Sequence, residues 1–552
     1  MRFFPAFLNL VFIMLLSNAC SEKEGATPVS PLEMRGLTLD GREWSAHLAG
    51  ARRKPTIRAA FSEPVARNSA AEAFQLTEPS GAPIPLDLAF DRGDSVVVLT
   101  PSVTLQPLAS HRLTLDGRLK SASGNAFNAI ISRTFSTHID SSRKFPPISD
   151  DSLLTLVQRQ TFRYFWDFGH PVSGLARERN SSGDLVTSGG SGFGIMAIPV
   201  AVHRNFVTRA EGLARMKKIV DFLKNTAVRV KGAYPHWLNG ATGAVIPFSA
   251  NDNGADLVET SYLVMGLLTA RQFFDGTGSE EKSLRADIDT LYRQVQWDWF
   301  RNNGQDALYW HYSPDKAWVM NMRIRGWNEC LITYVLAASS PSYGIPKSVY
   351  NAGWADNGRP GFVNGNAYYG INLPLGPAYG GPLFFSHYSF MGIDPRGLSD
   401  AYADYGVQTR NHSLINQAYC KTNPKGYYGY SDSCWGLTAS DISNGYTASS
   451  PTNDVGVIAP TAALSSMPFT PAESMKALRF FYHTLGDRLW KDYGFIDAFS
   501  LNQGWFANSF LAIDQGPIIV MIENHRSGLP WRLFMSAPEV REGLRKLDFK
   551  GF

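Results

Sequence analysis

Short stretches in which apolar and polar residues alternate follow one another over the first quarter of the chain. Three of them are residues 56–61, 95–99 and 111–115, and turn-forming residues separate them. Alternation with a period of two at this spacing is typical of the strands of an antiparallel sandwich. The pattern therefore predicts a small all-β domain over residues 34–140.

A helical pattern replaces this alternation after Pro146-Pro147. Apolar residues then recur every three to four positions over residues 153–165, 219–223, 256–274 and 478–489. Long loops rich in Gly, Asn and Pro, such as residues 350–382, lie between the helical segments, and loops of this length usually serve function. The pattern predicts a mainly α domain over residues 148–552, and helix pairs with long loops fit an α/α toroid.

The N-terminus has the composition of an export signal over residues 1–19: Arg2, an apolar stretch from Phe3 to Leu16, and small residues before Cys20. The apolar stretch is shorter than the roughly 20 residues of a membrane-spanning helix. Small residues that run into a cysteine resemble a bacterial lipobox, in which cleavage leaves Cys20 as the lipidated first residue. Residues 20–33 are polar and predict a tether.

The residues after Cys20 bear on where the protein is sent. Ser21-Glu22-Lys23-Glu24 resembles an acidic tag that directs lipoproteins to the outer face of a bacterial outer membrane. We therefore expect an exported, surface-exposed outer-membrane lipoprotein, held to the membrane by an N-terminal lipid. A periplasmic protein, released by ordinary cleavage near Ala19, is the alternative.

The composition of the chain restricts the classes of partner that the protein can bind. The 552 residues include 52 basic and 48 acidic ones, which are interspersed and give a net charge of +4. Without a basic tract or a nucleic-acid-binding motif, nucleic acid is excluded as a partner, and we expect a monomer. Aromatic residues make up 12% of the chain, many beside His, Asn or Gly, which suits a groove that binds sugars.

The cysteines give no support to zinc chemistry. The chain has no CxxC pair and no HExxH motif. Cys420 and Cys434 bracket a loop rich in Gly and Tyr, and in an oxidising compartment they could close it with a disulfide.

Three carboxylates, Asp252, Asp256 and Glu259, follow one another at steps of four and three residues. On an α-helix these positions lie within roughly 60° of one another. Like charges held close raise one another's pKa, so one acid and one base can coexist at neutral pH. The alternative is structural: Asp252 in a turn or at an N-cap, and the other two in the first turn of a helix.

Several longer motifs occur in order from about Ser152 to the C-terminus. They include Thr161 to Trp166, His170 to Arg177, Pro235 to Leu238, Asp256 to Thr260, Arg325 to Glu329, Ser450 to Asp454 and Ala512 to Pro517. Together they resemble the bacterial glycoamylase-like family, which contains endo-β-1,2-glucanases and sophorose-releasing exo-enzymes. Residues 61–137 resemble bacterial Ig-like domains, for which we expect the role of a spacer. The resemblance implies an (α/α)6 barrel that hydrolyses β-1,2-linked glucan with inversion and without a metal or organic cofactor.

The resemblance also assigns site residues. The acidic cluster of the family falls on Asp252, Asp256 and Glu259, and its separate essential glutamate on Glu329. A second essential aspartate falls on Asp514, which we favour over Asp497. Candidates for sugar contact are Arg325, Trp327, His236, Trp237, Phe193 and Asp454.

The roles follow from the chemistry of inversion. One carboxylic acid must protonate the leaving oxygen while a carboxylate about 6.5 to 9.5 Å away activates water. Our hypothesis makes Glu329 the acid, and Asp514 or a member of the cluster the base. Residues 189–192, Gly-Gly-Ser-Gly, lack the spacing of a phosphate loop and predict a flexible loop that lets substrate approach closely. The alternatives are an exo-acting sophorose- or glucose-releasing glucosidase and a non-catalytic glycan-binding lipoprotein.

Overall fold

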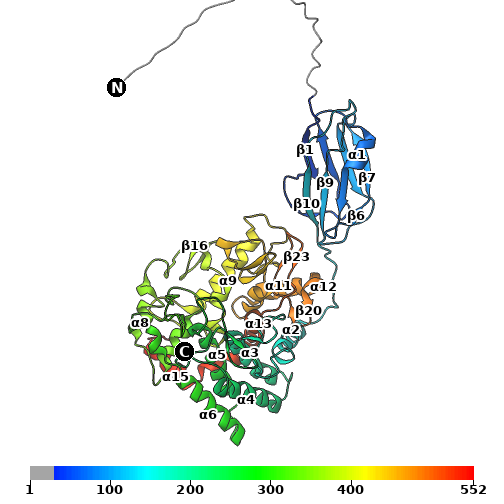
Figure 1. Ribbon diagram of the computed structural model, residues 1–552. Helices are drawn as coiled ribbons and strands as arrows, with labels where there is room; N and C mark the ends of the chain where they lie inside the picture. The colour runs from blue at the N-terminus through cyan, green and yellow to red at the C-terminus, as the bar shows by residue number, and fades with distance from the viewer. Residues whose placement is uncertain (1–29) are drawn as a thin grey trace, which may run out of the picture. The chain divides into compact units, whose positions relative to one another are not determined.

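The computed structural model describes residues 30–552, which form two compact units (Figure 1). The smaller unit contains residues 30–47, 51–105 and 111–135, and the larger one contains residues 48–50, 106–110 and 136–552. The predicted signal, Cys20 and most of the tether lie outside the described residues. Within residues 30–552, no helix combines the length and the apolar composition that crossing a membrane requires.

The smaller unit is built from two five-stranded sheets. In spatial order, the first contains β2 (Arg42–Glu43), β1 (Met34–Leu39), β4 (Ile57–Phe61), β8 (Val96–Pro101) and β7 (Leu86–Asp91). The second contains β3 (Leu48–Ala51), β10 (Ile131–Thr137), β9 (Ser110–Leu115), β5 (Phe74–Thr77) and β6 (Pro83–Ile84), and α1 (Arg67–Ala73) leads into β5. Alternate residues of β4 are buried, namely Ile57, Ala59 and Phe61, as a strand with one face on the core requires. The three strands predicted from alternation are confirmed.

Helices dominate the larger unit. They are α2 (Asp150–Trp166), α3 (Ser188–His203), α4 (Arg209–Asn225), α5 (Leu257–Phe273), α6 (Ser279–Arg293), α7 (Leu331–Ser339), α8 (Lys347–Ala352), α9 (Tyr405–Thr422), α10 (Pro460–Ser465), α11 (Pro471–Arg479), α12 (Gly486–Leu489), α13 (Ala512–Arg526), α14 (Leu529–Met535) and α15 (Pro538–Lys546). The predicted helices at 153–165, 219–223 and 256–274 are confirmed. The segment 478–489 is not one helix, because a π-helical turn at Phe480–Thr484 interrupts it.

Short strands link the helices of the larger unit. They include β11 (Leu185–Thr187), β12 (Trp237–Asn239), β13 (Val245–Ile246), β14 (Ala255–Asp256), β15 (His311–Tyr312), β18 (Ala439–Ile442), β19 (Gly445–Ala448), β22 (Phe499–Ser500) and β23 (Trp505–Phe506). The others are β16 (Ala367–Tyr368), β17 (Ile371–Asn372), β20 (Trp490–Lys491) and β21 (Gly494–Phe495). They pair only in two- or three-stranded sheets, so the helices carry the architecture.

The helices fall into an inner and an outer set. Helices α3, α5, α7 and α13 are buried along nearly their whole length, whereas α4, α6 and α15 bury one face only. Helices α3 and α5 lie side by side in the interior (Figure 1) and touch through glycines. A Cβ added at Gly192 would lie 2.2 Å from the Tyr262 carbonyl oxygen, and one added at Gly266 would lie 2.2 Å from the Gly192 carbonyl oxygen. The glycines therefore set the close spacing of these two helices.

A buried ion pair joins three of the helices. Glu523 on α13 is fully buried and accepts hydrogen bonds at 2.8 Å from both Nε and a terminal nitrogen of Arg204, which caps α3. Gln158 on α2 donates a third hydrogen bond, at 3.0 Å. Burial alone would raise the pKa of Glu523, but these donors lower it, so the carboxylate stays ionised.

We expect Glu523→Gln to lower the free energy of unfolding of the larger unit by about 2 to 4 kcal/mol, because it leaves a partly buried guanidinium without its counter-charge. The control is Asp167→Asn, which removes the half-exposed pair with Arg163 and should cost less than about 1 kcal/mol. Chemical denaturation of both variants measures the difference. Equal losses would show that the buried pair adds no particular stability.

The predicted disulfide is not formed. Cys420, at the end of α9, and Cys434 are both free, buried thiols, as is Cys330. The loop between Cys420 and Cys434 is closed by hydrogen bonds instead, because the Asn423 side chain bonds to the backbone N–H and C=O of Tyr427 at 2.9 and 2.8 Å. Burial also raises the pKa of both thiols, which disfavours the thiolate that disulfide formation needs.

Candidate active site

A cavity of about 410 Å³ lies in the larger unit where several inner helices begin. Thr187 caps α3, Glu259 is in the first turn of α5, Glu329 precedes α7 by two residues, and Ile513 is in the first turn of α13. The other lining residues are Glu178, Arg179, His236, Trp237, Phe248, Tyr262, Trp310, Phe384, Tyr388, Ala439, Tyr446 and Leu511. Carboxylates and aromatic rings therefore share one hollow, at the positive ends of the inner helices.

The three clustered acids do not share one helix, as their spacing predicted. Helix α5 begins only at Leu257, and Asp256 is its N-cap, accepting hydrogen bonds at 2.9 Å from the N–H groups of Val258 and Glu259. Asp252 lies before the helix in a turn that its N–H closes on the Ser249 carbonyl at 3.1 Å. The structural alternative holds for Asp252, in a turn, and for Glu259, in the first turn of α5, whereas Asp256 caps the helix; all three carboxylates still come together.

Two histidines bring them together. His311 Nε2 lies 3.4 Å from Asp252 Oδ2 and 3.7 Å from Asp256 Oδ2. His236 Nδ1 lies 3.2 Å from Asp256 Oδ2, and its Nε2 lies 4.0 Å from Glu259 Oε1. Acids and imidazoles therefore alternate in one row, Asp252, His311, Asp256, His236 and Glu259, which limits the repulsion between the carboxylates.

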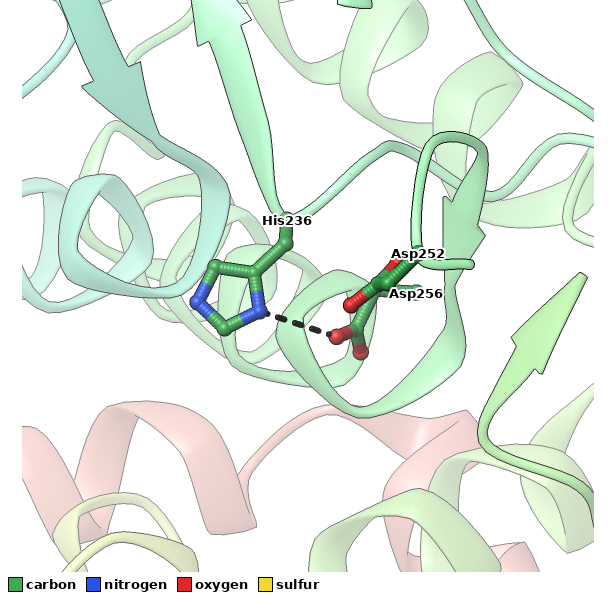
Figure 2. Close-up of side chains that lie close together, drawn as sticks. All are labelled: His236, Asp252 and Asp256. Carbon is green, nitrogen blue, oxygen red and sulfur yellow. Dashed lines mark hydrogen bonds and ion pairs between the residues drawn. The ribbon is translucent and has the colours of Figure 1, made fainter. Parts of the chain in front are cut away.

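The charges in this row follow from its contacts. Burial alone would lower the pKa of His236, but the charge of Glu259 and the hydrogen bond and charge of Asp256 raise it to about 9. For Asp256, burial would raise the pKa, but the hydrogen bond from His236 and the charges of both histidines lower it. His236 is therefore an imidazolium at neutral pH and Asp256 a carboxylate, and Figure 2 shows the hydrogen bond between them.

The same side chains offer a cation site. Ligand atoms of His236, Asp252 and Asp256 lie within 4.8 Å of one another, and the two carboxylates face the imidazole (Figure 2). To bind a cation, His236 would have to lose the proton that its raised pKa favours and give up its hydrogen bond to Asp256. The hydrogen bond between His236 and Asp256 is thus the competing use of these atoms.

Glu259 is held at the start of α3. Its Oε2 accepts hydrogen bonds from the Gly189 N–H at 2.7 Å and from the Thr187 hydroxyl at 3.4 Å. A Cβ at Gly189 would lie 2.3 Å from that oxygen, so the contact requires glycine. Residues 189–192 form the first turn of α3 and are buried, so the prediction of a flexible loop is wrong.

Glu329 lines the cavity from a different segment, just before α7. Burial, with smaller contributions from the charges of Glu259 and Asp256, raises its pKa to about 7. The Ser389 hydroxyl donates to the Glu329 backbone carbonyl and fixes the segment. Glu329 can therefore hold a proton near neutral pH, whereas Asp256, whose pKa is lowered, stays ionised.

Asp514 belongs to a second group of acids. It lies buried in the first turn of α13, next in sequence to the lining residue Ile513, and its carboxyl lies beside that of Asp497. Burial and the charge of Asp497 raise the pKa of Asp514, and burial with the charge of Asp441 raises the pKa of Asp497 to about 7. The Asp514–Asp497 pair therefore shares one proton and keeps one negative charge.

Comparison with known proteins identifies the chain. The Glycoamylase family model, whose description is that of a glucoamylase, matches residues 321–538, and that of the bacterial Ig-like domain matches residues 46–137. An endo-β-1,2-glucanase from Chitinophaga pinensis, solved with sophorotriose and glucose, is 51% identical and has a TM-score of 0.71 over 73% of this chain and 99% of that one. The chain belongs to the glycoamylase-like family.

Two further comparisons are with proteins from Parabacteroides distasonis. An exo β-1,2-glucooligosaccharide sophorohydrolase (non-reducing end) is 47% identical over 422 residues, which are 73% of this chain. This chain spans only 58% of that relative's length. The crystal structure of a β-1,2-glucanase is 39% identical, with a TM-score of 0.70 over 94% of this chain and 74% of that one.

Not every predicted sugar contact lies in the cavity of this glycoamylase-like chain. His236 and Trp237 line it. Phe193 is fully buried, with its ring 5.2 Å from that of Tyr262 and 5.1 Å from that of Tyr388, so it supports the cavity wall from behind. Trp327 packs among Trp354, Phe390 and Tyr405 in the core. The prediction of sugar contact is wrong for Phe193 and Trp327, because neighbouring rings cover both.

Two polar candidates also lie outside the cavity lining. Arg325 forms an ion pair with Asp356 at 3.5 Å. Asp454 is buried and accepts hydrogen bonds from the hydroxyls of Tyr430 at 2.7 Å and Tyr419 at 3.0 Å. Both side chains therefore have structural partners where sugar contact was predicted.

The sequence did not single out several of the lining residues. Among them are Glu178, Arg179, Phe248, Tyr388 and Tyr446. Glu178 and Arg179 directly follow the family motif that ends at Arg177, which was an available signal. The three aromatic residues come from loops and a hairpin far apart in the chain, and no local pattern marks them.

Proposed function

We propose that this protein is a glycoside hydrolase that cleaves β-1,2-glucosidic bonds of β-1,2-glucan with inversion. Glu329 carries the proposal, because it is a carboxyl with a pKa raised to about 7 that lines a cavity rich in aromatic rings. Two relatives that are 47% and 51% identical to this chain over the aligned residues are named for action on β-1,2-linked glucans. Aromatic walls with a few polar groups suit the alternating apolar and hydroxylated faces of glucose.

Glu329 is the general acid in this proposal. A raised pKa keeps its carboxyl protonated up to about neutral pH, so it can protonate the oxygen of the leaving sugar. Burial and then the charges of Glu259 and Asp256 favour the protonated form of Glu329, because they disfavour a second anion nearby.

The Asp514–Asp497 pair is the general base. A pair that shares one proton still has one negative charge, so it can accept a proton from the attacking water. Asp514 does not itself line the cavity, but it lies close to the cavity wall, because burial and then the charge of Asp514 raise the pKa of the lining residue Tyr388. A base drawn from the acidic row, with Glu259 as the member that lines the cavity, is the alternative.

The acidic row positions the sugar. Glu259 and His236 line the cavity with one anionic or neutral acceptor and one cationic donor, and both suit hydroxyl groups. Asp252 and Asp256 lie behind them and hold the histidines in place.

Incubation with β-1,2-glucan, followed by chromatographic sizing of the products, tests the proposal. A ladder of oligosaccharides indicates endo action, and release of sophorose or glucose alone indicates exo action, for which the 47% identical sophorohydrolase is the precedent. Unchanged polymer with measurable affinity would leave a glycan-binding protein and overturn hydrolysis. The first-formed product should be the α-anomer by NMR, and chelation with EDTA should leave the rate unchanged.

Architecture and location complete the proposal. The inner helices that begin at the cavity and the half-buried helices outside them support an (α/α)6 toroid over residues 148–552, with an Ig-like spacer over residues 34–140. We place the protein on the outer membrane as a monomeric lipoprotein linked through Cys20. Radiolabelled palmitate should label the protein in cells but not its Cys20→Ala variant, and labelling of both would refute the anchor.

A further inference from the structure

The β18–β19 hairpin separates two hollows. One is the cavity with Glu329, and the other is an open groove of about 560 Å³ on the far side of the hairpin. Arg179 and Tyr446 line both hollows. The hairpin is therefore a partition between two adjoining hollows.

The partition is rigidly held. Asp441 on β18 receives hydrogen bonds from Arg179 at 3.1 Å and from the Ser509 hydroxyl at 2.5 Å. Its own N–H donates to Asp497 at 2.7 Å, which ties the hairpin to the acid pair. Tyr446 pairs with Asp441 across the hairpin, so the backbone that carries its ring is held in place.

Tyr446 is nevertheless 51% exposed. A large aromatic side chain on a fixed hairpin, exposed between two hollows, offers a flat apolar face that a sugar ring can cover. Both of its sides border space that a ligand could occupy.

The groove has the chemistry of a sugar site. Trp505 on β23 packs on one side against the buried residues Val457, Ala459 and Ala498, which fixes its ring in the groove wall. The Asn180 side chain joins the groove floor by hydrogen bonds to the backbone of Asn508 at 3.0 Å and Phe510 at 3.0 Å. An indole ring beside amide groups suits a neutral, hydroxylated ring.

The charges of the groove argue against an anionic ligand. Arg179 is its one lining cation, and it is already paired with Glu178 at 2.9 Å and with Asp441 at 3.1 Å. Phosphate or carboxylate groups would meet the Asp441 carboxylate there, and a guanidinium that is already paired.

We propose that this groove binds glucosyl residues of the same glucan chain that extend past the hairpin, with Tyr446 as the shared platform and Trp505 as the platform of the groove. The inference rests on the proposed hydrolysis and adds a second stretch of binding sites to it. Chains long enough to cross the hairpin bind more tightly than chains that fill only the cavity.

The test compares Trp505→Ala with the unaltered protein on β-1,2-glucooligosaccharides of increasing length. We expect KM to rise about five- to tenfold for long chains, because one aromatic platform is lost. For the shortest cleaved oligosaccharide KM should stay unchanged, and kcat should stay unchanged for both substrates. Trp505→Phe keeps a ring and should restore most of the affinity.

The outcomes separate this inference from the proposed function. A KM change that is the same at every length, or no change at any length, overturns the second groove while hydrolysis stands. Absence of hydrolysis by the unaltered protein overturns the proposed function instead. Titration of the polymer against Glu329→Gln with and without Trp505→Ala measures the same contact without turnover, and equal affinities would refute it.

Discussion

Glu329→Gln should lower kcat on β-1,2-glucan by about 10²- to 10⁴-fold while KM changes little. The amide keeps the shape of the side chain but cannot protonate the leaving oxygen. Because the pKa of Glu329 is raised to about 7 and the protonated form is the active one, kcat/KM of the unaltered enzyme should fall as the pH rises above about 7. Steady-state release of reducing ends, measured across pH, gives both results.

The matched control is Glu473→Gln, on a half-buried glutamate of α11 outside the cavity lining. It should change kcat less than about twofold, since a partly exposed charge on a helix contributes little. Turnover of Glu329→Gln within a factor of about ten of the unaltered protein would reject Glu329 as the acid.

Asp514→Asn should lower kcat by a similar factor of about 10² to 10⁴, because an amide cannot take the proton of the attacking water. Asp497→Asn should cost less and should shift the pH profile, since Asp497 acts by sharing a proton with Asp514. Calorimetric titration of Asp514→Asn with oligosaccharide should show affinity close to that of the unaltered protein.

The comparison of the two variants also decides between the two aspartates that the sequence left open. A larger loss for Asp497→Asn than for Asp514→Asn would move the role of base to Asp497. Near-normal turnover of both would leave Glu259 of the acidic row as the base.

Much of the fold could be predicted because its signals are local. The alternation in residues 56–61 and the apolar repeat in 153–165 each reflect one strand or helix that buries one face, and both elements form where predicted. The prediction of one helix over residues 478–489 was wrong, because the π-helical turn at Phe480–Thr484 interrupts an apolar repeat that is continuous in the sequence.

The site was predicted in its residue types more than in its geometry. Asp252, Asp256, Glu259 and Glu329 do meet around one cavity or directly behind it, as the motifs implied. The assumed helix face did not exist, because Asp256 caps α5 and Asp252 lies in the preceding turn. Trp327 and Phe193 have polar or small neighbours in sequence, yet rings from distant segments cover them.

The sequence by itself determined the two kinds of domain, the family and the candidate catalytic acids, because periodicity and motifs depend on neighbours along the chain. Only the tertiary structure decided how those acids are charged. The row from Asp252 to Glu259 depends on His236 and His311, and the shared proton of Asp514 depends on Asp497, from segments that meet only on folding. A pKa is set by burial and by charges in space, which the order of residues does not record.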